Sequence, residues 1–166
     1  ILNFDKTYKL KNFDYKNKEK IINNNFDLND LNFDYFTNKN LTKLSIFDSD
    51  VKTNFNSQQN FVNFTGKYSL NEGRKLDFDI SQSIKKELLN LKFSADFDEL
   101  LEFELINYSK KKGDVANISF DLNKDKNSIK MNQINFKDRE NSFVLNGAEF
   151  SNGKLLQLDQ LLVKTF

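Results

Sequence analysis

Apolar residues stand at every second position over short runs along most of the chain. Successive side chains of a β-strand point to opposite faces, so this spacing gathers the apolar residues on one face of a sheet. The runs are Leu2, Phe4, Tyr8 and Leu10; Ile22, Phe26 and Leu28; Leu31, Phe33 and Tyr35; Val62, Phe64, Tyr68 and Leu70 with Gly66 in the remaining slot; Leu76, Phe78 and Ile80; Leu91, Phe93, Ala95 and Phe97; Leu101, Phe103 and Leu105; Ala116, Ile118, Phe120 and Leu122; and Phe143 and Leu145 with Gly147. The positions between them carry mainly Asp, Asn, Lys, Ser and Glu, which predicts a solvated opposite face.

Short polar clusters separate many of these runs, and their Gly, Asn and Asp residues are typical of turns. The clusters are Asn71–Arg74, Lys110–Asp114, Asn123–Asn127, Lys137–Asn141 and Ser151–Lys154. Strand starts recur roughly every 12 to 15 residues, which suits antiparallel hairpins and leaves no room for the crossovers of parallel strands. The chain is therefore predicted to be all-β, a meander of hairpins, with Lys110–Lys112 at a solvated hairpin tip.

One segment has the spacing of a helix instead. Ile84, Leu88 and Leu91 recur at helical intervals, and Ser81 or Ser83 is available as an N-cap. This pattern predicts one short helix near residues 82–91.

The size and composition favour one folded domain. A chain of 166 residues has room for one ordinary core, and 18 Phe with 5 Tyr are far too many aromatic residues for a disordered protein. No shift in composition marks an internal boundary, so residues 1–166 are interpreted as a single β-repeat region. The chain begins at Ile1 and contains neither a signal sequence nor a membrane-spanning run, from which we expect a fragment of a longer protein.

The charge and residue types exclude several classes of function. Lys and Arg number 25 and Asp and Glu 24, with both signs interspersed, so the basic surface of a nucleic-acid-binding protein is missing. The chain has no Cys and no His, which removes disulfides, thiolate nucleophiles, imidazole bases and most zinc sites.

Paired carboxylates are the strongest candidates for catalysis. The pairs are Asp77 and Asp79, Asp96 and Asp98, and Glu102 and Glu104. Residues i and i+2 of a strand share a face about 7 Å apart, which is near the carboxyl separation of glycosidases. Each pair nevertheless lies between inward apolar residues with Lys nearby, as expected of a solvated face. We therefore predict no catalytic residue, no metal site and no cofactor, and a protein that is not an enzyme.

The same pattern leaves open whether the apolar face is closed or accessible. Sandwiches favour short strands with tight turns, and Asn-Gly and Asp-Gly turn dipeptides are scarce here. A long, open, curved antiparallel sheet with one groove-like apolar face is at least as consistent as a sandwich. Such a face needs a lid, a partner or a ligand.

The C-terminal part of the chain resembles the AsmA-like family of bacterial envelope proteins. The resemblance lies in the strand rhythm of Val115–Leu122, Ser128–Phe136, Asn141–Phe150 and Gly153–Leu156, and it is greatest to the YhdP and TamB branch. Those proteins of Gram-negative bacteria have an N-terminal inner-membrane helix and a periplasmic body of stacked β-strands. They resemble the bridge-like lipid transfer proteins, whose groove carries phospholipid acyl chains between membranes.

The resemblance implies a periplasmic segment, anchored to the inner membrane by a part outside this chain, that functions in phospholipid transport and outer-membrane biogenesis. Its expected partners are phospholipid acyl chains and neighbouring β-repeats of the same chain. The groove candidates are Phe64, Tyr68, Phe78, Ile80, Phe93, Phe97, Phe103, Leu105, Ile118, Phe120, Phe136, Phe143 and Leu145. Any of them can instead be ordinary core in a structural or adhesive sandwich or solenoid domain. A third alternative, part of an outer-membrane barrel, is less favoured because Phe is spread along every run instead of being gathered into two girdles.

Overall fold

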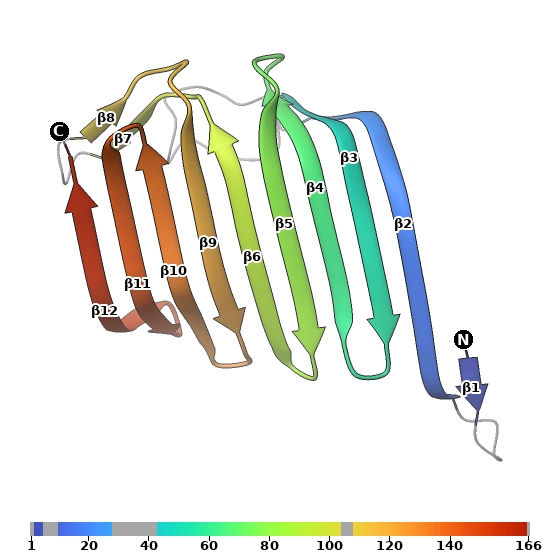
Figure 1. Ribbon diagram of the computed structural model, residues 1–166. Coiled ribbons are helices and arrows are strands. Elements are labelled where there is room, and N and C mark those ends of the chain that lie inside the picture. The colour runs from blue at the N-terminus through green and yellow to red at the C-terminus, as the bar shows by residue number, and fades with distance from the viewer. Residues whose placement is uncertain (1, 5–9, 28–42, 104–107, 166) are drawn as a thin grey trace.

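A computed structural model describes residues 2–4, 10–27, 43–103 and 108–165, and within them it contains only strands, turns and loops (Figure 1). The strands are β1 (Leu2–Phe4), β2 (Leu10–Asp27), β3 (Lys43–Asn56), β4 (Asn60–Leu70), β5 (Leu76–Lys85), β6 (Leu88–Phe97), β7 (Leu101–Phe103), β8 (Tyr108–Lys110), β9 (Ala116–Lys124), β10 (Ser128–Asp138), β11 (Asn141–Ser151) and β12 (Lys154–Lys164). No helix in this described part of the chain is long and apolar enough to cross a membrane.

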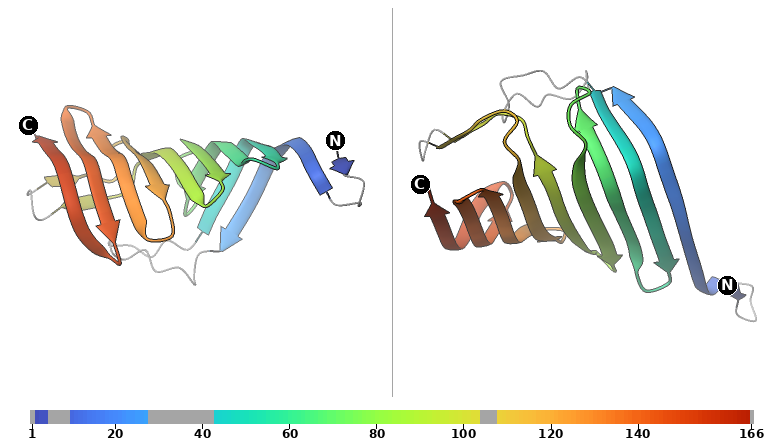
Figure 2. Two further views of the ribbon diagram at one scale, coloured as in Figure 1. Left: turned by 90° about the horizontal axis from the view of Figure 1, so that it is seen from below. Right: turned by 45° about the horizontal axis from the view of Figure 1, so that its top comes forward.

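One large antiparallel sheet dominates the fold. Its strand order is β1-β2-β3-β4-β5-β6-β9-β10-β11-β12, in which the three-residue β1 extends a sheet of longer strands through its pairing with β2. The sheet is open, because β1 and β12 stand at its two ends and are not paired with each other. It twists strongly from one end to the other, as its view from below shows (Figure 2). The prediction of an all-β, extended antiparallel sheet is confirmed.

A small hairpin interrupts the meander. Strands β7 and β8 pair with each other and are inserted between β6 and β9, which are themselves neighbours in the large sheet. Leu101 of β7 and Tyr108 of β8 pack against Ala116 and Phe136 of the large sheet. The hairpin therefore covers part of one sheet face at the end where β6 finishes and β9 begins (Figure 1).

The predicted helix near residues 82–91 is wrong. Strand β5 runs to Lys85, a turn follows at Lys86 and Glu87, and β6 begins at Leu88. Lys86 has a φ of 57°, which is outside the helical region. Ile84 and Leu91 belong to two alternating strands, and the two-residue turn between those strands gives a seven-residue spacing that also suits a helix. The pairing of β5 with β4 and of β6 with β9 favours the extended backbone.

The strand register gathers the apolar residues on one face. Phe78 of β5 lies between Gly66 of β4 and Ala95 of β6. Phe93 of β6 lies in the same way between Ile80 of β5 and Phe120 of β9. Cross-strand neighbours share a face, so these rows form one apolar surface across the sheet.

The opposite face carries polar side chains in cross-strand pairs. Lys67 Nζ lies 2.7 Å from Asp77, Asn63 donates to Asp79 at 3.1 Å, and Asn117 donates to Asp96 at 3.0 Å. Exposed pairs of this kind contribute at most about 1 kcal/mol each to stability. The paired carboxylates of β5 thus form side-chain contacts with β4 on the solvated face.

The predicted turns are confirmed, with one correction. The turns after β4, β9, β10 and β11 fall within the predicted polar clusters. Lys110, however, does not lie at a solvated tip: it ends β8 and is 1% exposed. Its Nζ donates to the carbonyl oxygens of Glu99 at 2.6 Å and of Lys111 at 3.2 Å. Those hydrogen bonds replace the water that a lysine otherwise requires.

Candidate functional site

An apolar pocket of about 380 Å³ lies on the inner face of strands β3 to β6. Two residues from each strand line it: Leu44 and Ile46, Phe64 and Tyr68, Phe78 and Ile80, and Phe93 and Ala95. No charged side chain is among them. The site is thus a hydrocarbon-lined depression in an open sheet.

Small residues beside Phe78 shape this pocket. Phe78 pairs with Gly66 on one side and with Ala95 on the other, so its ring has room to lie against the sheet. The Phe64 ring meets it edge to face, with centroids 4.7 Å apart. Phe78 is buried while Phe64 and Phe93 are only partly buried. The buried ring therefore forms a floor and the other two remain accessible beside it.

Among the described residues that line the pocket, Tyr68 supplies the one polar side-chain atom. Its hydroxyl donates to the main-chain oxygen of Asp96 at 2.5 Å. Burial, with smaller contributions from the carboxylates of Asp98 and Asp96, raises the pKa of Tyr68 to about 12. The phenol is therefore neutral at physiological pH, so none of the described lining residues offers a charge to a ligand.

This shift predicts a loss of stability at alkaline pH. The native protein keeps the Tyr68 proton up to a pKa of about 12, whereas the unfolded chain releases it near 10. Because the native state then binds more protons, the free energy of unfolding falls as pH rises from 10 to 12. Urea unfolding at several pH values is expected to show a shallower fall for Tyr68→Phe than for the unchanged protein. Equal falls in the two proteins would show that the raised pKa of Tyr68 does not cause the loss of stability.

The apolar surface continues from the pocket across the next strands. The rings of Phe93 and Phe120 stack with centroids 5.0 Å apart. Beyond them, Leu122 of β9 pairs with Leu91 of β6 and Met131 of β10. This row connects the pocket to the C-terminal end of β9 and the N-terminal end of β10.

The hairpin covers a second apolar cluster on the same face. Phe97, Ile118 and Phe143 pack against the buried residues Leu101, Tyr108, Ala116 and Phe136. The rings of Tyr108 and Phe136 meet edge to face with centroids 5.6 Å apart. This part of the face is a closed core instead of an accessible groove.

The predicted groove residues thus fall into separate environments. Five of them line the pocket: Phe64, Tyr68, Phe78, Ile80 and Phe93. Four belong to the cluster under the hairpin: Phe97, Ile118, Phe136 and Phe143. Phe120 and Leu145 are partly buried on the face between and beyond these groups. Phe103 lies in β7, and Leu105 lies outside the described residues.

Sequence reasoning missed Leu44, Ile46 and Ala95 as pocket residues. Ala95 belongs to a predicted apolar run, but its small side chain did not indicate a groove contact. Leu44 and Ile46 do alternate, yet the register of β3 against β4 shifts between Phe47 and Asp50. A shift of one residue reverses the phase of the pattern, so β3 as a whole shows no continuous alternation.

The site offers shape and apolar surface instead of reactive groups. Among the described ranges, no three His, Cys, Asp or Glu residues lie close enough together to hold a metal ion. Comparisons with protein-family models, curated proteins and solved structures find no match to this chain.

Proposed function

We propose that this chain is a lipid-conducting β-groove segment of the AsmA-like type. In this role it holds phospholipid acyl chains on its apolar face while they pass between the inner and outer membranes of a Gram-negative envelope. The observation that carries the proposal is the open, uncharged pocket lined by Phe64, Phe78 and Phe93. A soluble protein with no use for such a surface covers it.

The physical basis of the function is the removal of hydrocarbon from water. Each methylene group of an acyl chain gains about 0.8 kcal/mol when it is buried against apolar side chains. The described lining residues carry no charged group and a single hydroxyl, which is already bonded to Asp96. A surface of this kind holds hydrocarbon without a specific polar contact, so a chain can slide along it.

The edge strand β12 supports the further proposal that neighbouring β-repeats extend the groove. Six apolar residues of this 11-residue strand are between 41% and 63% exposed: Leu155, Leu156, Leu158, Leu161, Leu162 and Val163. Leu161 and Val163 pair with Leu145 and Phe143, and so lie on the apolar face. Exposed edge strands are normally blunted by charge, bulges or a cover. Addition of a further strand is the simplest way to bury this one.

The closed cluster under the hairpin favours a second candidate function, a structural or adhesive β-domain. In that case the pocket is an imperfectly filled part of the core and takes no ligand. The two functions differ in whether lipid accompanies the folded protein.

Lipid carried through purification tests the proposal. The chain is expressed in Escherichia coli and purified without detergent, and bound lipid is measured by native mass spectrometry and by extraction. We expect phospholipid on the unchanged protein and a loss of at least about tenfold in Phe64→Asp, because 1.4 kcal/mol suffices for a factor of ten. A buried carboxylate costs more than that.

A matched control separates the groove from general damage. Phe61 lies three residues from Phe64 on the same strand, pairs with Ser83 and points to the opposite face. Phe61→Asp is expected to retain its lipid, and circular dichroism checks that both variants keep their strands. A folded, lipid-free unchanged protein would overturn the proposal in favour of the structural domain.

A further inference from the structure

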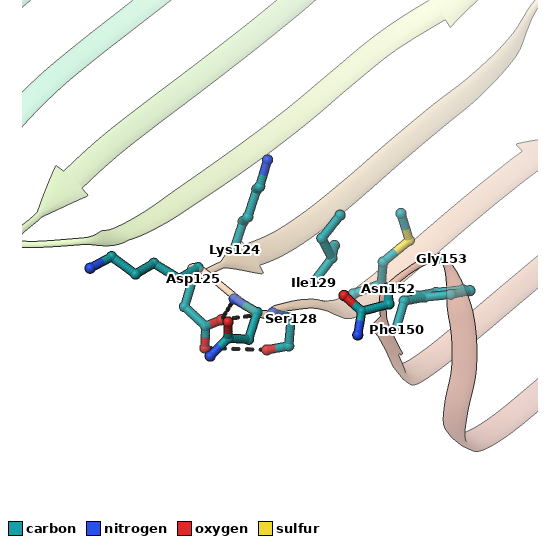
Figure 3. A pocket seen from close by; sticks show the side chains of 10 residues that line it. Lys124, Asp125, Ser128, Ile129, Phe150, Asn152 and Gly153 are labelled. Carbon is teal, nitrogen blue, oxygen red and sulfur yellow. Dashed lines mark hydrogen bonds between the residues drawn. The ribbon is translucent and has the colours of Figure 1, made fainter.

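A second pocket, also of about 380 Å³, lies where the turns after β9 and β11 approach each other (Figure 3). Its lining includes the apolar side chains of Ile129, Met131 and Phe150 and the polar side chains of Lys124 and Asn152. The pocket is thus amphipathic, whereas the described residues that line the pocket on β3 to β6 include no charged side chain.

Lys124 has an unusual position in the register. It pairs with Leu89 of β6 and with Ile129 of β10, so it continues a row of the apolar face. Figure 3 shows the side chains of Lys124 and Ile129 projecting from the same side of the sheet. Lys124 also lies four residues after Phe120 on β9, a distance of about 13 Å at the rise of a strand. An ammonium group therefore stands at the end of the apolar strip.

The charged side chains next to Lys124 in the chain, those of Asp125 and Lys126, already have partners. Lys126 Nζ lies 2.7 Å from Glu87. Asp125 accepts hydrogen bonds from the main-chain N–H groups of Asn127 at 2.8 Å and Ser128 at 2.7 Å, and one from the Ser128 hydroxyl at 3.2 Å. Figure 3 shows the Asp125 carboxylate facing these turn atoms and not Lys124. Within the described ranges, Lys124 forms no ion pair with any carboxylate.

We propose that Lys124 binds the anionic headgroup of a phospholipid whose acyl chains lie along Leu122 and Phe120 toward the pocket on β3 to β6. This inference rests on the proposed function and adds a headgroup preference to it. A lysine ammonium binds phosphate as a point charge, and the apolar neighbours Leu89 and Ile129 remove part of the competing water. The arrangement matches an amphiphile, because hydrocarbon contacts and the cation occur in one continuous strip.

The test compares two headgroups on the same acyl chains. Isothermal titration calorimetry measures the binding of monomeric dihexanoyl phosphatidylglycerol, which is anionic, and of dihexanoyl phosphatidylcholine, which is zwitterionic. We expect the anionic lipid to bind about fivefold more tightly, the ratio that an ion pair of about 1 kcal/mol provides. Lys124→Gln is expected to abolish this preference, and Lys124→Arg to retain it.

The controls separate the site from general electrostatics and from a site for free phosphate. Lys130 is exposed and pairs with Asn123 and Glu149, so Lys130→Gln removes the same charge from the other face and is expected to leave the preference unchanged. Inorganic phosphate alone is expected to bind at least tenfold more weakly than the anionic lipid.

Each contrary outcome identifies what fails. Equal affinity for the two lipids, unchanged in Lys124→Gln, would overturn the headgroup inference and leave the proposed function standing. Phosphate binding that depends on Lys124 and is as tight as that of the lipid would likewise overturn it. Absence of binding by either lipid would overturn the proposed function and the inference together.

Discussion

Replacing Gly66 with alanine is expected to destabilise the protein by about 3 kcal/mol. A Cβ atom at this position would lie 2.7 Å from the Ser49 Cα atom and 2.5 Å from its Cβ atom, and it would also collide with the Ser49 hydroxyl. Because a main-chain atom is among these neighbours, rotation of a side chain does not relieve the overlap. The free energy of unfolding in urea measures the effect.

The overlap arises from a bulge in β3. The register shifts between Phe47 and Asp50, and Asp48 there has a φ of 43°. Ser49 is 1% exposed, and its hydroxyl donates to the Phe47 carbonyl oxygen at 2.7 Å. Gly66 therefore accommodates the bulge on one side and the Phe78 ring on the other. Its replacement is expected to disturb the pocket as well as the strand pairing.

Gly113→Ala is the matched control for this prediction. Gly113 has a φ of 89°, but no atom of the described residues lies within 4 Å of an added Cβ, so only backbone strain of about 1 kcal/mol is expected. If Gly66→Ala cost no more than Gly113→Ala, the close approach of Ser49 would not be a constraint on the fold.

Replacing Lys110 with methionine is expected to destabilise the protein by about 3 kcal/mol and to release the β7–β8 hairpin. Methionine keeps the apolar stem but leaves the carbonyl oxygens of Glu99 and Lys111 without their donor. It also removes the ammonium group that lies 5.2 Å above the centre of the Phe97 ring. Burial lowers the pKa of Lys110, but the nearby carboxylates, led by Asp98 and Asp138, oppose that shift.

Loss of this cation also affects the buried carboxylate of Asp138. Asp138 is 6% exposed and accepts a hydrogen bond from the Tyr108 hydroxyl at 2.8 Å. Its second oxygen has no hydrogen-bond partner in the described part of the chain. Without the positive charge of Lys110, this carboxylate is less well compensated, which adds to the cost of the substitution.

Hydrogen exchange and urea unfolding measure the two effects of Lys110→Met. The amides of β8 are expected to exchange faster than those of β10, because the hairpin separates from the sheet before the sheet unfolds. Lys111→Met, at the exposed neighbouring position, is the control and is expected to change the stability by less than about 0.5 kcal/mol. Equal stability of the two variants would show that the buried lysine does not anchor the hairpin.

The one-sided sheet could be predicted from the sequence because its cause is local. Alternation in segments such as Leu76–Ile80 and Ala116–Leu122 assigns each side chain to a face without reference to any other strand. For the same reason, five of the residues that line the pocket, Phe64 and Phe93 among them, could be placed on the apolar face from their pattern alone.

Only the tertiary structure decided which part of the apolar face forms an accessible pocket and which part is a closed core. Phe97 and Phe93 have the same pattern, but the hairpin covers Phe97 and leaves Phe93 at the pocket. The environment of Lys110 likewise depends on carbonyl groups and carboxylates brought from other segments. The turn at Lys86 replaced the predicted helix because strand pairing on both sides outweighs a local spacing that suits either structure. Alternation specifies which face a side chain occupies, whereas the residues that cover that face come from elsewhere in the chain.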